Sequence, residues 1–293
     1  MSSQSSSHTK SLAALRAIWK IVFGDSEEFI DLYFSRRYPN AKTFISLQDG
    51  QIAAQAQCFL YQMTTAATDF CSIPRPQPQT HKAVVTTVGY VSGLATLPQY
   101  RRQGHAANIM RQLHSWLQTQ GADYSMLIPA DEAAAQWYQS HFGYLHAART
   151  PQYMISEQQL SRCTEHRELT PELINLIQQH LASTPYTIQH TAQDLRDQLA
   201  VCQMSGGGLY SLPPAGKHDT TIHFMAEKIM MPDGTASFRV LDYFYALPAP
   251  TSYTPFLLHS ATSHNFSHQT CMYLPISHNK PLSDEIRITL MLD

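Results

Sequence analysis

The sequence has little charge and lacks any long apolar run. Charged residues make up only 14% of its 293 residues, and 20 Lys and Arg are balanced by 22 Asp and Glu, a formal net charge of −2. No basic field is present to attract a polynucleotide, so we expect no nucleic-acid partner. No segment approaches the roughly 20 apolar residues of a membrane-spanning helix, so we expect no membrane partner either. Apolar residues, at 43%, are still numerous enough to form packed cores.

Paired cysteines and metal-ligand clusters are also missing. The five cysteines show no Cys-x-x-Cys spacing and are odd in number, which disfavours a disulfide framework and a zinc cluster. His264 and His268 lie four residues apart, but neither a helical pattern nor an acidic partner accompanies them, so we predict no metal. Residues 1–10 are polar and serine-rich without an apolar core, which predicts a disordered lead and, by default, a cytoplasmic protein.

Residues 11–150 predict a regular succession of helices and strands. Asp49-Gly50 is the strongest hairpin signal in the chain and predicts two antiparallel strands around it. Asp25 or Ser26 can cap the helix before this hairpin. Three prolines between Ser72 and Lys82 predict a surface loop. The predicted order is helix 11–23, helix 25–38, hairpin 43–64, a strand ending at 96, helix 104–120, strand 123–130 and a helix closing at 143.

The segment Tyr100–Met110, "YRRQGHAANIM", joins a strand to a helix through small residues. The uncharged run Val88–Leu97 predicts the strand, Pro98 stops it, and apolar residues spaced three and four apart predict the helix. Gly104 falls in the first helical turn, where backbone N–H groups have no helical partner, so this turn can bind an anion. It matches neither a Walker loop, which needs Lys-Ser or Lys-Thr, nor the three glycines of a Rossmann fingerprint.

The pattern Arg101-x-x-Gly104-x-Ala106 resembles the Arg/Gln-x-x-Gly-x-Gly/Ala signature of the GNAT superfamily of N-acetyltransferases. The element order over residues 10–150, a meander followed by a βαβ unit, is similar to that superfamily as well. The resemblance implies an α+β fold with a central mixed sheet flanked by helices, and acetyl-CoA as cosubstrate. It implies that the loop amides hold the pyrophosphate and that the strand before the loop pairs with the pantetheine arm through its backbone. The residues so implied are Leu94, Ala95, Thr96, Arg101, Arg102, Gln103, Gly104, His105, Ala106 and Ala107.

Two longer segments, residues 92–117 and 126–144, look like a bacterial subgroup related to the Eis-type (enhanced intracellular survival) acetyltransferases. Ile128-Pro129-Ala130 before an acidic pair, and a Tyr-containing helix that ends in Phe-Gly-Tyr, carry this resemblance. It implies a catalytic GNAT domain, a second degenerate GNAT-like α/β domain and a C-terminal strand that returns towards the active site. The expected divisions are a lead at 1–10, a catalytic domain at 11–150, a linker at 151–168 and the second domain at 169–293.

The second half predicts helices first and strands afterwards. Thr170 caps a helix that Pro171 opens, and "TAQDLRDQLAVCQM" is another amphipathic run. The strand-like segments are "GGLYSL", "TTIHFMAEKIM", "FRVLDYFYAL" and "TCMYLPI", with a turn at 232–234 between two of them. No Arg-x-x-Gly-x-Gly/Ala loop follows residue 150, so a second GNAT-like domain would lack the pyrophosphate site.

Acetyl transfer to an amine needs an acid for the departing thiolate and a base for the ammonium. The resemblance points to Tyr138 as the acid, since a phenol stays protonated at neutral pH. Family members often read Tyr-x-x-x-Gly, whereas Tyr138 lies five residues before Gly143, which an extra residue in the following turn would explain. The alternative is a purely structural tyrosine.

The base has internal and terminal candidates. Asp131 and Glu132 follow the strand beside the expected cosubstrate, although two acids at a helix start are more often caps. In Eis-type enzymes the terminal carboxylate reaches the catalytic pocket, and this chain ends in the alternating pattern "DEIRITLMLD". The resemblance therefore implies the α-carboxylate of Asp293 as base or ammonium anchor. The alternative is an edge strand that ends at the surface.

These features favour an acetyl-CoA-dependent N-acetyltransferase that works by direct attack of a primary amine. Cysteine-based ping-pong chemistry is disfavoured, since no cysteine lies near the loop in the sequence. We expect a small-molecule or peptide amine as acceptor, bound between the two halves, and the Eis resemblance leaves a homo-oligomer open. The rival interpretation is a non-catalytic acyl-CoA-binding sensor or scaffold.

Overall fold

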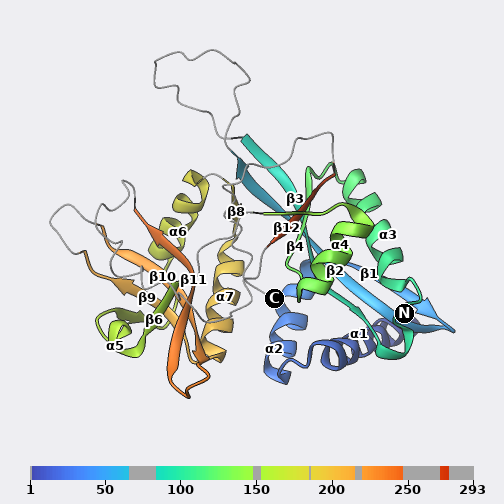
Figure 1. Ribbon diagram of the computed structural model, residues 1–293, viewed down its shortest axis with the longest axis horizontal. Helices are drawn as coiled ribbons and strands as arrows, with labels where there is room; N and C mark the ends of the chain where they lie inside the picture. The colour runs from blue at the N-terminus through green and yellow to red at the C-terminus, as the bar shows by residue number, and fades with distance from the viewer. Residues whose placement is uncertain are drawn as a thin grey trace, which may run out of the picture.

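A computed structural model describes residues 2–65, 84–147, 153–184, 186–214, 220–246 and 271–276. The described elements gather into two lobes, each built on one sheet (Figure 1). The first sheet has seven strands and the second has five. The predicted α+β class is thereby confirmed. None of the described helices is long and apolar enough to span a membrane.

The first sheet is mixed, as the sequence predicted. Its strands run in the order β1-β2-β3-β4-β12-β5, and β8 pairs with the far end of β2. β3 and β4 are parallel, whereas the other pairs are antiparallel. The strands are β1 (Lys42–Gln48), β2 (Gln51–Thr65), β3 (Val84–Thr96), β4 (Tyr124–Leu127), β5 (Leu145–His146), β8 (Thr187–Gln189) and β12 (Met272–Pro275).

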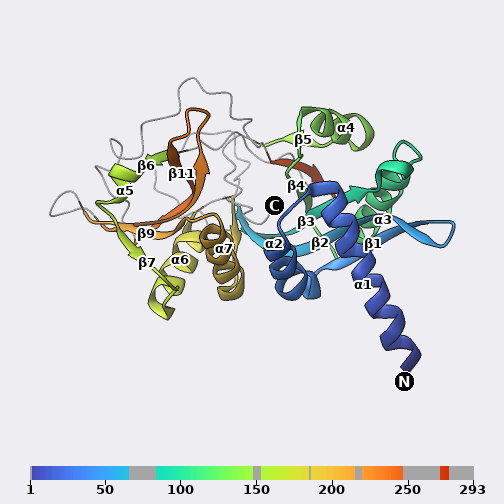
Figure 2. The ribbon, with the colours of Figure 1, turned by 90° about the horizontal axis from the view of Figure 1, so that it is seen from below.

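Helices cover both faces of the first sheet (Figure 2). One face carries α1 (Ser2–Phe23) and α2 (Glu27–Leu32), and a single π-helical turn (Tyr33–Arg37) continues α2. The other face carries α3 (His105–Thr119) and α4 (Glu132–Phe142). Each face has its own buried apolar cluster, so β2 and β3 are covered on both sides.

Several local signals hold in the structure. Ser26, rather than Asp25, caps α2 by accepting a hydrogen bond from the Phe29 amide at 3.1 Å. Asp49 and Gly50 have φ values of 49° and 76°, the left-handed pair that a two-residue hairpin requires. The predicted start of the first helix was wrong, because α1 begins at Ser2. Its first ten residues contain neither proline nor glycine to break the helix.

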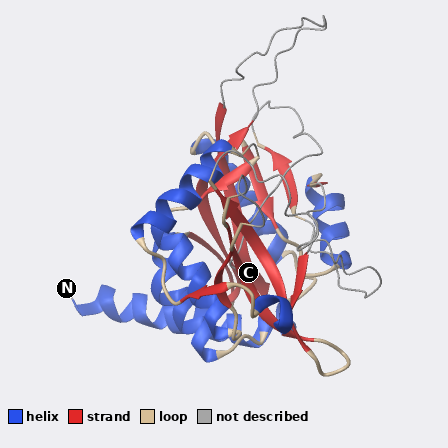
Figure 3. Ribbon diagram, turned by 90° about the vertical axis from the view of Figure 1, so that its left-hand side faces the viewer, coloured by secondary structure: helices blue, strands red, loops and turns tan. Residues whose placement is uncertain are grey.

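The second sheet is antiparallel, with its strands in the order β6-β11-β10-β9-β7. Figure 3 views the molecule from the side of this lobe, with strands in red and helices in blue. Two helices, α6 (Pro171–Ser183) and α7 (Ala192–Met204), contribute to the buried cluster on one of its faces, and Thr170 caps α6 as predicted. A shorter helix, α5 (Glu157–Leu160), follows its first strand. The strands are β6 (Tyr153–Ser156), β7 (Thr164–His166), β9 (Gly208–Leu212), β10 (Ile222–Met230) and β11 (Ala236–Tyr245).

Two strands from the second half of the chain belong to the first sheet, where β8 pairs with β2 and β12 lies between β4 and β5. The segment "TCMYLPI" belongs to the second half of the chain, yet β12 within it pairs with β4 and β5 of the first sheet. Met272 and Tyr273 are buried there, one in each apolar cluster of that sheet. The alternating apolar pattern predicted the strand correctly, but a pattern cannot name the partner that buries it.

Candidate functional site

β3 and β4 lie side by side for a short distance and then part. Their paired residues run from Val88 with Tyr124 to Tyr90 with Met126, and no further pair follows among the described residues. β3 nevertheless continues to Thr96. Beyond Tyr90 its edge towards β4 therefore carries backbone N–H and C=O groups without a strand partner. Such an edge can take up an extended chain as an added strand.

A β-bulge lies on β3 beside this gap. The register with β2 shifts between Gln55 and Gln57, so that two residues of β3, Gly93 and Leu94, lie opposite one residue of β2. Gly93 has a φ of 61°, in the left-handed region. A Cβ at this position would lie 2.3 Å from Cζ3 of Trp19. Glycine is therefore required here both by the backbone and by the packing of α1.

We expect Gly93→Ala to lower the free energy of unfolding by about 3 kcal/mol, because left-handed strain and overpacking against Trp19 add. Gly121→Ala is the matched control, since Gly121 has a φ of 66° and nothing within 4 Å of its Cβ position. The control should lose only about 1 kcal/mol. Urea unfolding of both variants measures the difference in the free energy of unfolding. Equal losses would show that contact of the new Cβ with Trp19 does not destabilise the fold.

The loop after β3 ends in a helix start that no side chain caps. Gly104 is the N-cap of α3, with a φ of 85°, and the first turn of α3 contains no acidic residue. Nothing lies within 4 Å of a Cβ built on Gly104, so the approach to the first amides is open. Arg101 and Arg102 are exposed beside it. The helix dipole and two guanidinium groups thus favour an anion at this point.

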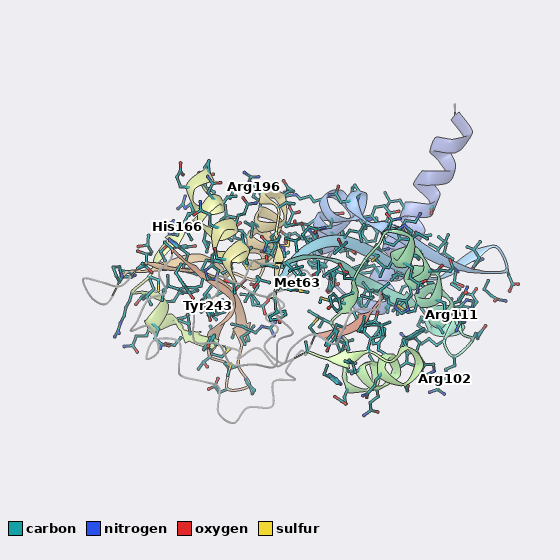
Figure 4. All side chains as sticks on the ribbon, turned by 90° about the horizontal axis from the view of Figure 1, so that it is seen from above. Met63, Arg102, Arg111, His166, Arg196 and Tyr243 are labelled. Atoms are coloured by element: carbon teal, nitrogen blue, oxygen red, sulfur yellow. The ribbon has the colours of Figure 1, made fainter. Side chains whose placement is uncertain are left out.

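The side chains of this loop differ in how far they can reach a ligand. The Arg101 Nε donates to the Thr96 carbonyl at 3.3 Å, and Figure 4 places Arg102 on the outer surface of the first lobe. The Gln103 amide donates to the Gln99 carbonyl at 3.1 Å. Three further members of the predicted set, His105, Ala106 and Ala107, form the first turn of α3.

His105 points into the protein rather than towards the loop. Its Nδ1 lies 2.9 Å from the Ser46 hydroxyl, and its ring is buried against Tyr100. The imidazole thus ties the start of α3 to β1. Only the backbone amide of His105 is left to contact a ligand at the loop.

Of the three strand residues in the predicted set, Ala95 and Thr96 pair with β2, whereas Leu94 lies in the bulge and has no partner in that register. Ala95 is buried and pairs with Gln55, while Thr96 pairs with Ala54. Leu94 packs against the cluster beneath α3 and α4. The side chains of Leu94 and Ala95 thus pack in the protein interior. This is compatible with the expectation that only the backbone of this strand contacts the pantetheine arm.

Tyr138 lies on the inner face of α4, in the apolar cluster beneath the gap. α4 continues to Phe142, and Gly143 follows at once with a φ of 77°, so the expected extra residue is not in the turn. It lies within the helix, which turns Tyr138 towards the core. Val91 and Leu127, which border the gap, belong to the same cluster. Burial raises the pKa of the Tyr138 phenol, which therefore holds its proton.

A buried polar chain beside Tyr138 was not foreseen. The Tyr144 hydroxyl lies 2.6 Å from the Ser125 hydroxyl and 3.0 Å from Nε2 of His114. Burial lowers the pKa of His114 to about 4, so this imidazole is neutral at pH 7. The chain joins α3, β4 and the end of α4. The Phe-Gly-Tyr ending was visible in the sequence, but nothing in a sequence pattern gives the partners of its tyrosine.

Cys58 belongs to the same cluster as Tyr138, although it lies far from the loop in the sequence. It is buried, and burial raises the pKa of its thiol, so it is not a thiolate at neutral pH. Cys58 is therefore a poor nucleophile because of its burial, a reason that distance along the sequence did not give.

The base candidates fare differently. Asp131 is the N-cap of α4 and accepts a hydrogen bond from the Ala134 amide at 2.7 Å, while Glu132 is exposed in the first turn. Asp293, the terminal strand pattern, the proline-rich stretch 72–82 and the pair His264 and His268 all lie outside the described residues. Within the described ranges, no group of three or more His, Cys, Asp or Glu is placed to hold a metal ion.

A family comparison decides what this arrangement is. The model of the acetyltransferase (GNAT) family matches residues 12–144. This chain therefore contains a GNAT acetyltransferase domain. The domain comprises the first sheet up to Tyr144, the gap between β3 and β4, and the loop at Gly104. No curated protein matches the sequence.

Two solved structures agree with this chain on the fold, and a third shows a weaker likeness. A GCN5-related N-acetyltransferase from Anabaena variabilis has 15% identity and a TM-score of 0.60, over 91% of this chain and 71% of that one. A probable N-acyltransferase from Enterococcus faecalis has 14% identity and a TM-score of 0.51, over 80% of this chain and 56% of that one. Eis1 from Mycobacterium abscessus has 13% identity and a TM-score of 0.48, over 77% of this chain and 52% of that one. This chain thus spans little more than half of the last two proteins.

Proposed function

We propose that the protein is an acetyl-CoA-dependent N-acetyltransferase that moves an acetyl group to a primary amine by direct attack. The observation that carries the proposal is the alignment of two features along β3. Its unpaired edge beyond Tyr90 leads to the open, uncapped helix start at Gly104. An extended ligand with a phosphate end suits both, and acetyl-CoA is the cosubstrate of the GNAT family.

The residues divide the work in this proposal as follows. The amides of Arg102 to Ala107 bind the pyrophosphate, and the guanidinium groups of Arg101 and Arg102 add positive charge. The backbone of Leu94 to Thr96 aligns the pantetheine arm. When bound, acetyl-CoA supplies an activated acyl group in the form of a thioester. Tyr138 donates a proton to the departing thiolate. The α-carboxylate of Asp293 accepts a proton from the substrate ammonium or holds the ammonium in place.

The acceptor site is proposed between the two lobes, with an Eis-like second half as its outer wall. The π-helical turn after α2 and the helix α7 meet there, where Arg36 lies 3.4 Å from Asp197. Small amines, peptide N-termini and lysines are the candidate acceptors.

Calorimetric titration with acetyl-CoA and coenzyme A, followed by a thiol-release assay over a panel of amines, tests the function. We expect binding of both cosubstrate forms and thiol release that depends on an amine. Binding without release for any amine would favour the rival function, an acyl-CoA sensor, and absence of binding would remove both.

Tyr138→Phe is expected to lower kcat by roughly 10²-fold or more, because a positioned general acid contributes about that much. The Michaelis constant for acetyl-CoA should stay within a factor of about two, since the phenol does not hold the pyrophosphate. Tyr144→Phe serves as a control for buried hydroxyl loss in the same cluster. An unchanged kcat in Tyr138→Phe would mean that the tyrosine is structural.

A further inference from the structure

Gln57 is a buried polar side chain whose hydrogen-bonding groups are not satisfied. It lies on β2 with 0% of its surface exposed, and neither its Nε2 nor its Oε1 has a partner within the described part of the chain. Gln55, two residues earlier on the same face, donates from Nε2 to the Leu15 carbonyl at 3.0 Å, so only its Oε1 lacks a partner there. A fully unpartnered buried carboxamide is costly, so such a group calls for an explanation.

The Gln57 carboxamide lies over the bulge of β3. Gln57 pairs with Ser92, and its Oε1 lies 2.7 Å from the position that a Cβ of Gly93 would occupy. Because Gly93 has no side chain, the carboxamide can extend across β3 towards the edge that faces the gap. Trp19 from α1 covers the same spot. The unsatisfied group thus sits at the level where β3 and β4 have just parted.

This level is the deep end of the gap. Four residue steps of β3 separate Ser92 from Thr96, about 13 Å of extended strand, and the loop to Gly104 follows. A pantetheine arm anchored by its phosphate at Gly104 would run along this edge of β3 towards Ser92. Its acyl end would therefore reach the neighbourhood of Gln57.

We propose that Gln57 is a binding residue for the acyl group of acetyl-CoA, with its Nε2–H donating to the acyl carbonyl oxygen. The proposal rests on the proposed function. A primary amide is suited to this role because it is neutral and can donate to a carbonyl without competing for the amine proton. A donor aimed at that oxygen binds the acyl group and also favours charge that develops on it.

Gln57→Met tests the proposal, since it keeps the size of the side chain and removes both polar atoms. Without ligand, we expect this variant to melt a few degrees above the wild type, because an unsatisfied amide has been removed. By calorimetry, acetyl-CoA should bind about 10-fold more weakly while the affinity for coenzyme A stays unchanged. Gln57→Asn, which shortens the side chain by one methylene, should give a smaller loss and serves if the Met variant does not fold.

Gln55→Met is the matched control on the same strand and face. It removes the bond to the Leu15 carbonyl, so it should not gain stability, and it should bind both ligands as the wild type does. Unchanged acetyl-CoA affinity in Gln57→Met would overturn the proposal, as would an equal loss for both ligands. Both results leave the proposed function standing. A wild-type protein that binds neither ligand would overturn the two together.

Discussion

Asp194→Asn is expected to lower the free energy of unfolding by about 3 to 5 kcal/mol, because it leaves a buried guanidinium without its counter-ion. Nη1 of Arg37 bonds to the Asp194 carboxylate, and its Nη2 lies 2.5 Å from the Tyr61 hydroxyl. The two charged residues are only 6% and 8% exposed. The guanidinium also stacks over the Phe59 ring at 4.7 Å.

The surroundings of Asp194 stabilise its ionised carboxylate. Burial opposes its ionisation, but hydrogen bonds from Thr191 and the nearby Arg37 together hold the pKa of its carboxyl below the usual value. Asn at position 194 keeps one oxygen that can accept the capping bonds from Thr191 at the start of α7, so the substitution keeps the cap and removes the charge and the acceptor that face Arg37. The pair joins the π-helical turn of the first lobe to α7 of the second.

Urea unfolding of Asp194→Asn and of Asp31→Asn compares a buried pair with an exposed one. Asp31 is paired with Arg16, its side chain is 69% exposed, and its loss should cost less than about 1 kcal/mol. Adding Arg37→Met to Asp194→Asn should recover more than half of the loss, because no uncompensated buried charge then remains. Similar small losses in both single variants would mean that water reaches the Arg37 site.

Gly104→Glu is expected to weaken acetyl-CoA binding by roughly 100-fold or more. A carboxylate at the start of α3 would occupy the open space over the first amides and repel a phosphate from a helix end that favours anions. The fold should survive, because no atom lies within 4 Å of the new Cβ and the strain of a φ of 85° costs only about 1 to 2 kcal/mol.

Gly104→Gln separates charge from size in this experiment, since it carries the same strain and nearly the same volume. We expect the Gln variant to bind acetyl-CoA more tightly than the Glu variant by about 10-fold, and the gap between them to narrow at high salt. Calorimetry at two ionic strengths measures this. Equal affinities for wild type, Gln and Glu variants would place the pyrophosphate elsewhere.

The structure places the side chains of the predicted site residues, which residue patterns could do only in part. The turn at Gly104 was predictable because small residues and a proline lie between a strand pattern and a helix pattern. Gly104 has a left-handed φ, which glycine adopts without steric cost. The end of α4 at Gly143 was predicted, but the burial of Tyr138 was not, because the cluster around it is built from segments that lie far apart in the sequence. The inward side chain of His105 was likewise hidden, since its partner Ser46 lies 59 residues away.

The sequence alone predicted most of the helices and strands, the hairpin at Asp49-Gly50, the cap at Thr170 and the small-residue turn at Gly104. All of these depend on residues a few positions apart. Only the tertiary structure decided that β12 returns to the first sheet, that β3 and β4 part after Tyr90, and that Gln57 lies unsatisfied over Gly93. These features come from contacts between segments far apart in the sequence. An apolar pattern shows which face of an element must be buried, but it does not specify which other element buries it.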